Sequence, residues 1–200
     1  GRANAAIAWL AIDARVGTWR ASMASHAIAA FARPADLTSG QVVNGINVSD
    51  ALGGTNANDD GTVVNHDKLN PDYIQNVENL WWAVSILRAG GQSVPAAMFF
   101  NTNTVYGAFS QRNFEVPPFL DPGGFIYKED GSIYYPAGVD WGSRRPATYA
   151  GVDAFAALYA DAALGGEKWL ALHAGNVRQM QARWTDGHLY TDDQVEESYK

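Results

Sequence analysis

Helical periodicity, interrupted by proline and glycine, most strongly constrains what this chain can fold into. Apolar residues recur at helical spacing in the stretch 4–33, and Pro34 ends that pattern. The same periodicity returns at 71–89 and stops at Gly90 and Gly91. Both segments therefore predict helices with an apolar face, and Gly17 leaves open whether the first is one kinked helix or two.

Three further helices are expected at 95–111, 149–164 and 167–184. The connections between the predicted helices are alternately short and very long, the longest being 35–62 and 113–146. We interpret 113–146 as an insertion that carries one small β-hairpin, because an Asp-Gly turn separates two β-prone runs. The sequence thus predicts a mainly α fold of stacked helical hairpins with elaborated loops, and loops this long are usually functional.

Composition fits a single helical domain over residues 1–200. Hydrophobic residues make up 47% and charged residues 18%, enough apolar material for a core without the bias of disordered chains. The net charge of −7 argues against nucleic acid, because phosphate binding depends on clustered lysine and arginine. No apolar run approaches the roughly 20 residues of a membrane span. We expect neither nucleic acid nor a membrane as a partner.

Side chains suited to chemistry are concentrated in the segment 59–73, just before a predicted helix. Its fifteen residues contain four carboxylates, two amides, one imidazole and one phenol. Gly61 and Pro71 indicate a loop that leads into a helix N-terminus, a common place for functional side chains. We expect this segment to form one wall of a polar cleft. His26 and His173 fall in predicted helices, where packing or solvent exposure is the expected role.

Several short motifs follow one another in a characteristic order. They are Phe31-Ala32-Arg33-Pro34 after an Ala- and Trp-rich stretch, Asp60-Gly61-Thr62-Val63-Val64-Asn65-His66, Pro71-Asp72-Tyr73, Tyr134-Tyr135-Pro136 and Asp140-Trp141-Gly142. This order resembles bacterial secreted (α/α)-toroid proteins, namely the six-hairpin glycosidases and the toroid domains of alginate-lyase and heparinase-like polysaccharide lyases. The resemblance implies a secreted carbohydrate-active enzyme that cleaves a saccharide in a toroid cleft. Because such toroids contain more helices than this chain supplies, it also implies the N-terminal or central part of a larger, proteolytically cut toroid, completed by a second chain or fragment.

A lyase reading assigns roles to the polar loop. Lyases that act on uronic acids need a group that neutralises the sugar carboxylate, a base for the adjacent proton and an acid for the leaving oxygen. The resemblance implies that Asn65 and His66 polarise the carboxylate, while either Tyr73 or Tyr134 serves as the acid or base. Which tyrosine belongs to the site stays open.

A hydrolase reading uses carboxylates of the same cleft. Glycosidases need two carboxyl groups about 5 to 9.5 Å apart. Asp60 paired with Asp140 by folding is the favoured combination. Trp141 lies beside Asp140 in a loop and is suited to stacking on a sugar ring. In the lyase reading, Arg144 or Arg145 would bind the substrate carboxylate as a planar fork.

The segment 56–67 also approaches the spacing of a calcium loop. Oxygen-bearing side chains stand at its positions 1, 3, 5 and 12, with glycine at position 6. Position 1 lacks a carboxylate, so an Asx-rich turn that binds nothing is the competing interpretation. We expect no required cofactor, with calcium at this loop as the alternative.

A non-enzymatic function is the main alternative to cleavage. A secreted carbohydrate-binding or protein-interaction scaffold can keep such a fold without its chemistry, because fold does not determine function. Convergence of His66, Tyr134, Asp140 and Arg144 in one pocket would favour an enzyme. Scattered polar residues beside an exposed aromatic platform would favour a binding module.

Overall fold

The computed structural model describes residues 14–138 and 146–186. The fold is mainly helical. The α-helices are α2 (Val16–Ala30), α3 (Pro71–Ile74), α4 (Glu78–Ala89), α5 (Thr102–Ser110), α6 (Pro146–Tyr159) and α7 (Gly166–Gln181). Short 3-10 helices are η1 (Pro34–Thr38), η2 (Ser49–Ala51), η3 (Gln75–Val77), η4 (Ala96–Phe99) and η5 (Ala162–Leu164). None of the described helices has the length and apolar character that crossing a membrane requires.

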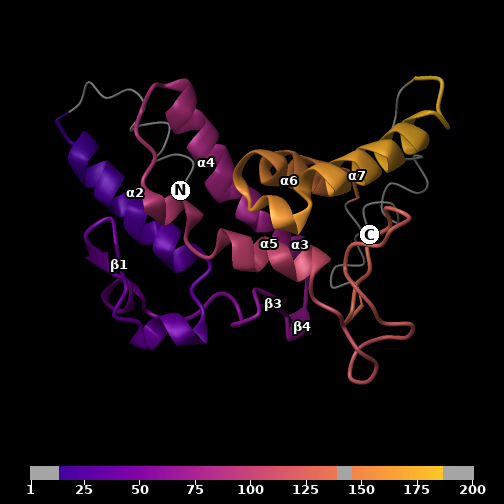
Figure 1. Cartoon of the computed structure of the whole chain (residues 1–200), viewed down its shortest axis with the longest axis horizontal. Coiled ribbons are helices and arrows are strands. Elements are labelled where there is room, and N and C mark those ends of the chain that lie inside the picture. Colours follow the sequence, from indigo (N-terminus) through magenta and orange to yellow (C-terminus); the bar gives the residue numbers. More distant parts are fainter. Residues whose placement is uncertain (1–13, 139–145, 187–200) are drawn as a thin grey trace.

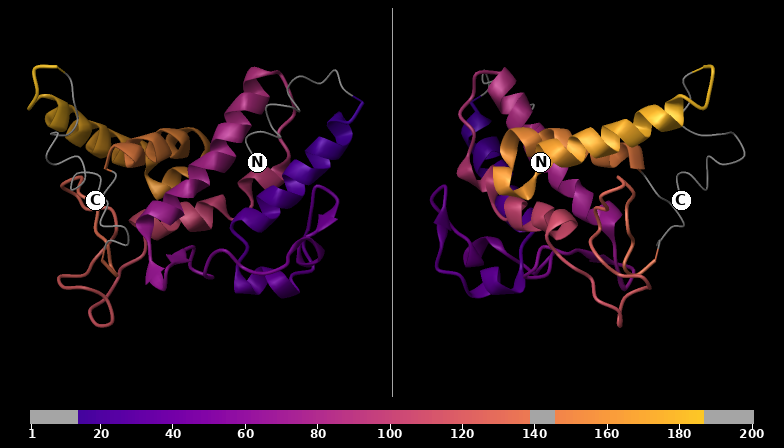
Figure 2. Two further views of the ribbon diagram at one scale, coloured as in Figure 1. Left: turned by 180° about the vertical axis from the view of Figure 1, so that it is seen from behind. Right: turned by 45° about the vertical axis from the view of Figure 1, so that its right-hand side comes forward.

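Helix α4 occupies the middle of the molecule. It lies between α2 on one side and the paired helices α6 and α7 on the other, as Figure 1 shows and the views in Figure 2 repeat. Helix α4 contacts α6 directly, and η4 contacts both α2 and α4. Trp81 of α4 is fully buried, whereas its neighbour Trp82 is 44% exposed, as expected for residues about 100° apart around a helix. The α4 region therefore joins the two halves of the core.

The run α3, η3 and α4 begins as predicted. The Asn70 side chain accepts a hydrogen bond from the Asp72 backbone N–H at 3.0 Å, and Pro71 occupies the first helical position. The run ends at Gly90, which follows the last residue of α4. Its 3-10 turn at η3 lies between two α-helical segments.

The predicted helix at 95–111 is wrong as a single element. It divides into η4 and α5 because Asn101 between them adopts a left-handed conformation, with φ of 59°. The Asn101 side chain donates hydrogen bonds to the Phe31 carbonyl at 2.8 Å and to Asp36 Oδ2 at 2.7 Å. These contacts outside the segment hold the break in place.

Two small hairpins lie in segments predicted to be irregular. Strand β1 (Val42–Val43) pairs with β2 (Ile46–Asn47), and β3 (Val64–Asn65) pairs with β4 (Lys68–Leu69), both antiparallel. Both central residues of each two-residue turn have positive φ, 53° and 78° in the first hairpin and 51° and 61° in the second. This geometry is typical of type I′ turns. The Asn44-Gly45 turn of the first hairpin carries the preferred sequence for this geometry.

The described part of the 113–146 insertion confirms the predicted hairpin. Tyr127 bridges Ile133 in antiparallel fashion across the Asp-Gly turn. Two tyrosine hydroxyls anchor the insertion to the helices: Tyr127 donates to Asp153 at 2.8 Å and Tyr135 donates to Asp72 at 2.8 Å. The insertion is thus fastened at two buried carboxylates.

Candidate functional site

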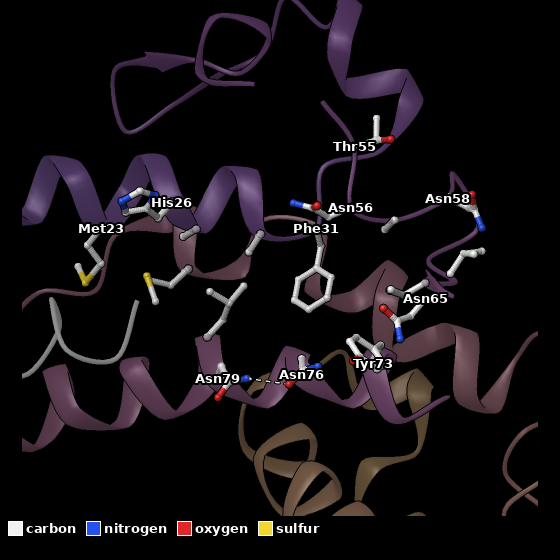
Figure 3. A pocket seen from close by; sticks show the side chains of 17 residues that line it. Met23, His26, Phe31, Thr55, Asn56, Asn58, Asn65, Tyr73, Asn76 and Asn79 are labelled. Carbon is white, nitrogen blue, oxygen red and sulfur yellow. Dashed lines mark hydrogen bonds between the residues drawn. The ribbon is translucent and has the colours of Figure 1, made fainter. Parts of the chain in front are cut away.

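A groove of about 670 Å³ opens between α2 and the α3, η3, α4 run (Figure 3). Helix α2 forms one wall. Met23, His26, Ala27, Ala30 and Phe31 follow one another at the spacing of a single helix face and line the groove. Apart from His26 they are apolar, so this wall continues into the hydrophobic core.

The opposite wall presents polar groups at regular spacing. Tyr73, Asn76 and Asn79 are three residues apart and share one face of the helical run. Asn79 Nδ2 donates to Asn76 Oδ1 at 3.2 Å, the contact dashed in Figure 3. Leu80 beside them and Met98 of η4 are buried and supply apolar floor. The groove therefore combines an apolar base with an amide wall.

The loop before β3 closes the third side. Asn56 Nδ2 donates to the Ala29 carbonyl at 2.8 Å, which fastens this loop to the end of α2. Asn58 Nδ2 donates to Thr62 Oγ1 at 2.8 Å. Both asparagines line the groove together with Asn65 of β3. Five amide side chains from three chain segments thus surround one cavity.

The described lining carries almost no charge. Its 17 residues include no aspartate, glutamate, lysine or arginine. His26 is the one lining side chain that can become cationic, and Figure 3 places it at the end of the groove away from Asn65 and Tyr73. Polar recognition in this groove therefore depends on neutral hydrogen-bonding groups.

Of the predicted catalytic residues, the groove brings together Asn65 and Tyr73. His66 follows Asn65 but occupies the exposed turn between β3 and β4, where its φ is 51°. Tyr134 belongs to the insertion, where its hydroxyl donates to the Leu120 carbonyl and Lys128 Nζ lies 4.6 Å from its ring centroid. Tyr73, rather than Tyr134, thus shares a cavity with Asn65.

Asp60 lies in a second hollow of about 730 Å³ beside α5 and η5. Its Oδ2 lies 2.6 Å from Arg112 Nη1, and its Oδ1 accepts hydrogen bonds from Thr62. Asp161 also lines this hollow, where its side chain caps η5 through the Ala163 N–H. Asp60 therefore does not share the groove of Asn65 and Tyr73. Its predicted partner Asp140, together with Trp141, Arg144 and Arg145, lies outside the described residues.

Three of the four oxygen-bearing side chains at the calcium-like spacing make contacts within the protein. Asn56, Asn58 and Asp60 are engaged as described above, and Asp59 Oδ1 accepts from the Ala35 N–H at 3.0 Å. Within residues 14–138 and 146–186, no three histidine, aspartate or glutamate side chains gather as a metal-binding group. Calcium at this loop stays a prediction.

A buried cluster around Asp153 lies apart from the groove. Asp153 Oδ1 accepts from Tyr106 at 2.7 Å and from Tyr127 at 2.8 Å, and its Oδ2 lies 2.5 Å from His173 Nδ1. Burial, reinforced by the negative charge of Asp153, raises the pKa of both tyrosines well above the ordinary value. The tyrosines therefore stay protonated as donors. The sequence expectation that His173 packs rather than faces a substrate agrees with its burial.

The sequence did not indicate Asn76 and Asn79 as groove residues. His26 is exposed, which was one of its two expected roles, and it also lines the groove. The available signal was the spacing of Tyr73, Asn76 and Asn79, which places polar groups on one face of the helical run. The run also carries Asp72, Gln75 and Glu78, so this spacing does not stand out from its other polar residues.

Comparison with known proteins found no matching family model, no matching curated protein and no matching solved structure.

Proposed function

We propose that the groove between α2 and α4 is the saccharide-binding cleft of a carbohydrate-active protein. The observation that carries this proposal is the combination of five amides, a tyrosine and an apolar floor in one open groove. Sugars present hydroxyl groups that both donate and accept, together with apolar C–H faces. Amide side chains offer both donors and acceptors, and aromatic rings pack on apolar faces.

Cleavage is proposed at the end of the groove that holds Asn65 and Tyr73. Tyr73 is partly buried against the core, with its side chain at the cavity wall. A phenol hydroxyl in this position is suited to proton transfer, and the Asn65 amide is suited to polarising a substrate oxygen. Their presence in one groove supports the proposed proton transfer, whereas the described lining offers no carboxylate pair for hydrolysis, so saccharide binding without cleavage is the second candidate function. His66, Asp60 and Tyr134 stand outside this groove and are not part of the proposed cleft.

The larger architecture is also a proposal. Helices α6 and α7 pack against each other as a helical hairpin, and α4 packs against α6. This arrangement is compatible with one sector of an (α/α) toroid. On the resemblance of the sequence motifs, we propose that further helices of a secreted toroid complete the cleft.

A two-part assay tests the proposal. Oligosaccharide binding is measured by calorimetry, and cleavage is measured by the release of reducing ends. Ultraviolet absorbance of an unsaturated sugar separates elimination from hydrolysis. Tyr73→Phe removes one hydroxyl from the groove, and Tyr134→Phe is the matched control in the insertion. We expect Tyr73→Phe to lower cleavage about 100-fold or more, the scale of general acid-base catalysis, with Tyr134→Phe close to the unaltered protein. Cleavage that depends on Tyr134 rather than Tyr73 would place the site elsewhere.

A further inference from the structure

We infer that the groove takes an uncharged oligosaccharide rather than a uronic acid chain, an inference that rests on the proposed saccharide function. The first observation is the charge of the lining. A bound uronate would carry one carboxylate per acidic sugar into a cavity whose 17 described lining residues include no lysine or arginine. A carboxylate that loses water without gaining a charged partner binds poorly. A neutral sugar pays no such penalty.

Two arginines that contact the loop at Asp59 and Asp60 have acidic partners, whereas Lys68 of β4, which pairs with Asn65, is exposed. Arg33 Nη2 lies 3.3 Å from Asp36 Oδ1, and Arg112 Nη1 lies 2.6 Å from Asp60 Oδ2. Asp59 and Asp60 directly follow Asn58 of the groove wall. The whole chain has a net charge of −7, which repels polyanions. The uncharged described lining and the net charge of the chain therefore both disfavour an acidic polysaccharide.

The paired amides of the helical wall fit neighbouring sugar hydroxyls. One hydrogen bond joins Asn79 Nδ2 to Asn76 Oδ1, and this contact does not use the Asn76 NH₂ group or the Asn79 carbonyl oxygen. The pair thus presents a donor beside an acceptor. Two adjacent hydroxyls of a sugar ring present the same complementary combination, whereas a carboxylate offers acceptors alone.

The groove is also long enough for a chain. Tyr73 and Asn79 are six residues apart on one helical run, which corresponds to about 9 Å along the axis. His26 extends the lining at the far end (Figure 3). A ligand longer than one sugar ring can therefore contact both the Asn76 and Asn79 pair and the end that holds Asn65. A neutral ligand has no carboxylate beside a ring proton, and the described lining has no carboxylate pair for hydrolysis, so this ligand class points to recognition, the second candidate function.

The test compares two series of probes on the full chain. The neutral series is hexasaccharides of glucose, mannose and xylose, and the acidic series is hexasaccharides of mannuronate and galacturonate. Affinities are measured by calorimetry at low and high sodium chloride. We expect binding from the neutral series, with less than about a twofold change in affinity between the two salt concentrations, because uncharged contacts are not screened.

Variants of the amide pair locate the binding. Asn76→Ala and Asn79→Ala should each weaken neutral-sugar affinity about three- to tenfold, the range for one lost neutral hydrogen bond. Gln179→Ala removes an exposed amide from α7, away from the groove lining, and should leave the affinity unchanged. Circular dichroism checks that each variant is folded. The salt dependence of the unaltered protein tests the inference independently of the variants.

The outcomes separate the two levels of the argument. Salt-insensitive binding of a neutral hexasaccharide that weakens in both alanine variants supports the inference. Preferential, salt-sensitive binding of uronates overturns the inference and keeps the saccharide function. Binding of neither series overturns the proposed function itself.

Discussion

Removal of the Asp153 carboxylate should destabilise the fold more than the loss of any exposed carboxylate. In the Asp153→Ala variant, the Tyr106 and Tyr127 hydroxyls and the His173 Nδ1 group lose their common acceptor. All four side chains are buried. Each buried donor left without a partner costs about 1–3 kcal/mol, although such costs are not additive.

The expected loss is about 3–5 kcal/mol in the free energy of unfolding, within the range of about 3–9 kcal/mol that three unpaired buried donors would cost together. The summed cost of three unpaired donors is larger, but relief of the desolvated carboxylate offsets part of it. Urea unfolding followed by tryptophan fluorescence measures the loss, since Trp169 stacks on His173 with ring centroids 6.2 Å apart. With a urea slope of about 2 kcal/mol per molar, the midpoint should fall by about 1.5–2.5 M at constant slope.

Asp130→Ala is the matched control. Asp130 also accepts two hydrogen bonds, from the backbone N–H and the hydroxyl of Ser132, but in an exposed turn. Water replaces those contacts, so its midpoint should stay close to that of the unaltered protein. Equal midpoints for the Asp153 and Asp130 variants would refute the argument that burial makes the Asp153 cluster stabilising.

Three further predictions concern local structure and pH. Asn70→Ala removes the N-cap of α3 and should lower the free energy of unfolding by about 1 kcal/mol, measured by urea unfolding. Asn113→Ala, at a position outside any helix, serves as the control. Gly61→Ala should lower the free energy of unfolding by about 1–3 kcal/mol or more, because Gly61 has φ of 83° and an added Cβ would lie 2.2 Å from the Thr104 carbonyl oxygen. Gly40→Ala is the control, since a Cβ there meets nothing within 4 Å. Equal thermal midpoints for the two variants would contradict this packing. Burial tends to raise the pKa of Asp36, but the Arg33 backbone N–H, the Asn101 amide and the Arg33 guanidinium together hold it below the ordinary 3.8. The stabilising contribution of the ionised Asp36 is therefore fully present above its ordinary pKa and is lost as the pH falls through its lowered pKa in the folded protein. Unfolding midpoints measured from about pH 6 down to about pH 2 should then fall less steeply in Asp36→Asn than in the unaltered protein.

Local signals predicted helix boundaries well where one residue dominates the backbone. Asn70 and Pro71 begin a helical run and Gly90 ends it, as the sequence indicated. The same rules failed at 95–111, because the left-handed Asn101 is held by contacts to Phe31 and Asp36, more than 60 residues away in the chain. Such contacts leave no periodic signal in the segment that they interrupt.

The predicted polar cleft was only partly visible in the sequence. Of the polar residues at 59–73, Asn65 and Tyr73 line the groove, and their role in function stays a prediction. Asp60 and His66 come from the same segment but face other surroundings, since Gly61 packs closely on α5 and the β3 to β4 turn directs His66 outward. Adjacency in sequence therefore did not predict adjacency in the cleft.

By itself the sequence determined the helical class, the caps and the apolar faces, because these depend on backbone preferences and on residues within one or two helical turns. Tertiary structure alone decided that α2, the loop at 55–65 and the α3, η3, α4 run enclose one groove, and that Asp153 collects Tyr106, Tyr127 and His173. The three partners lie 20 to 47 residues from Asp153 in the chain. They meet because burying apolar faces brings distant segments together, and buried polar groups must then find partners within the protein.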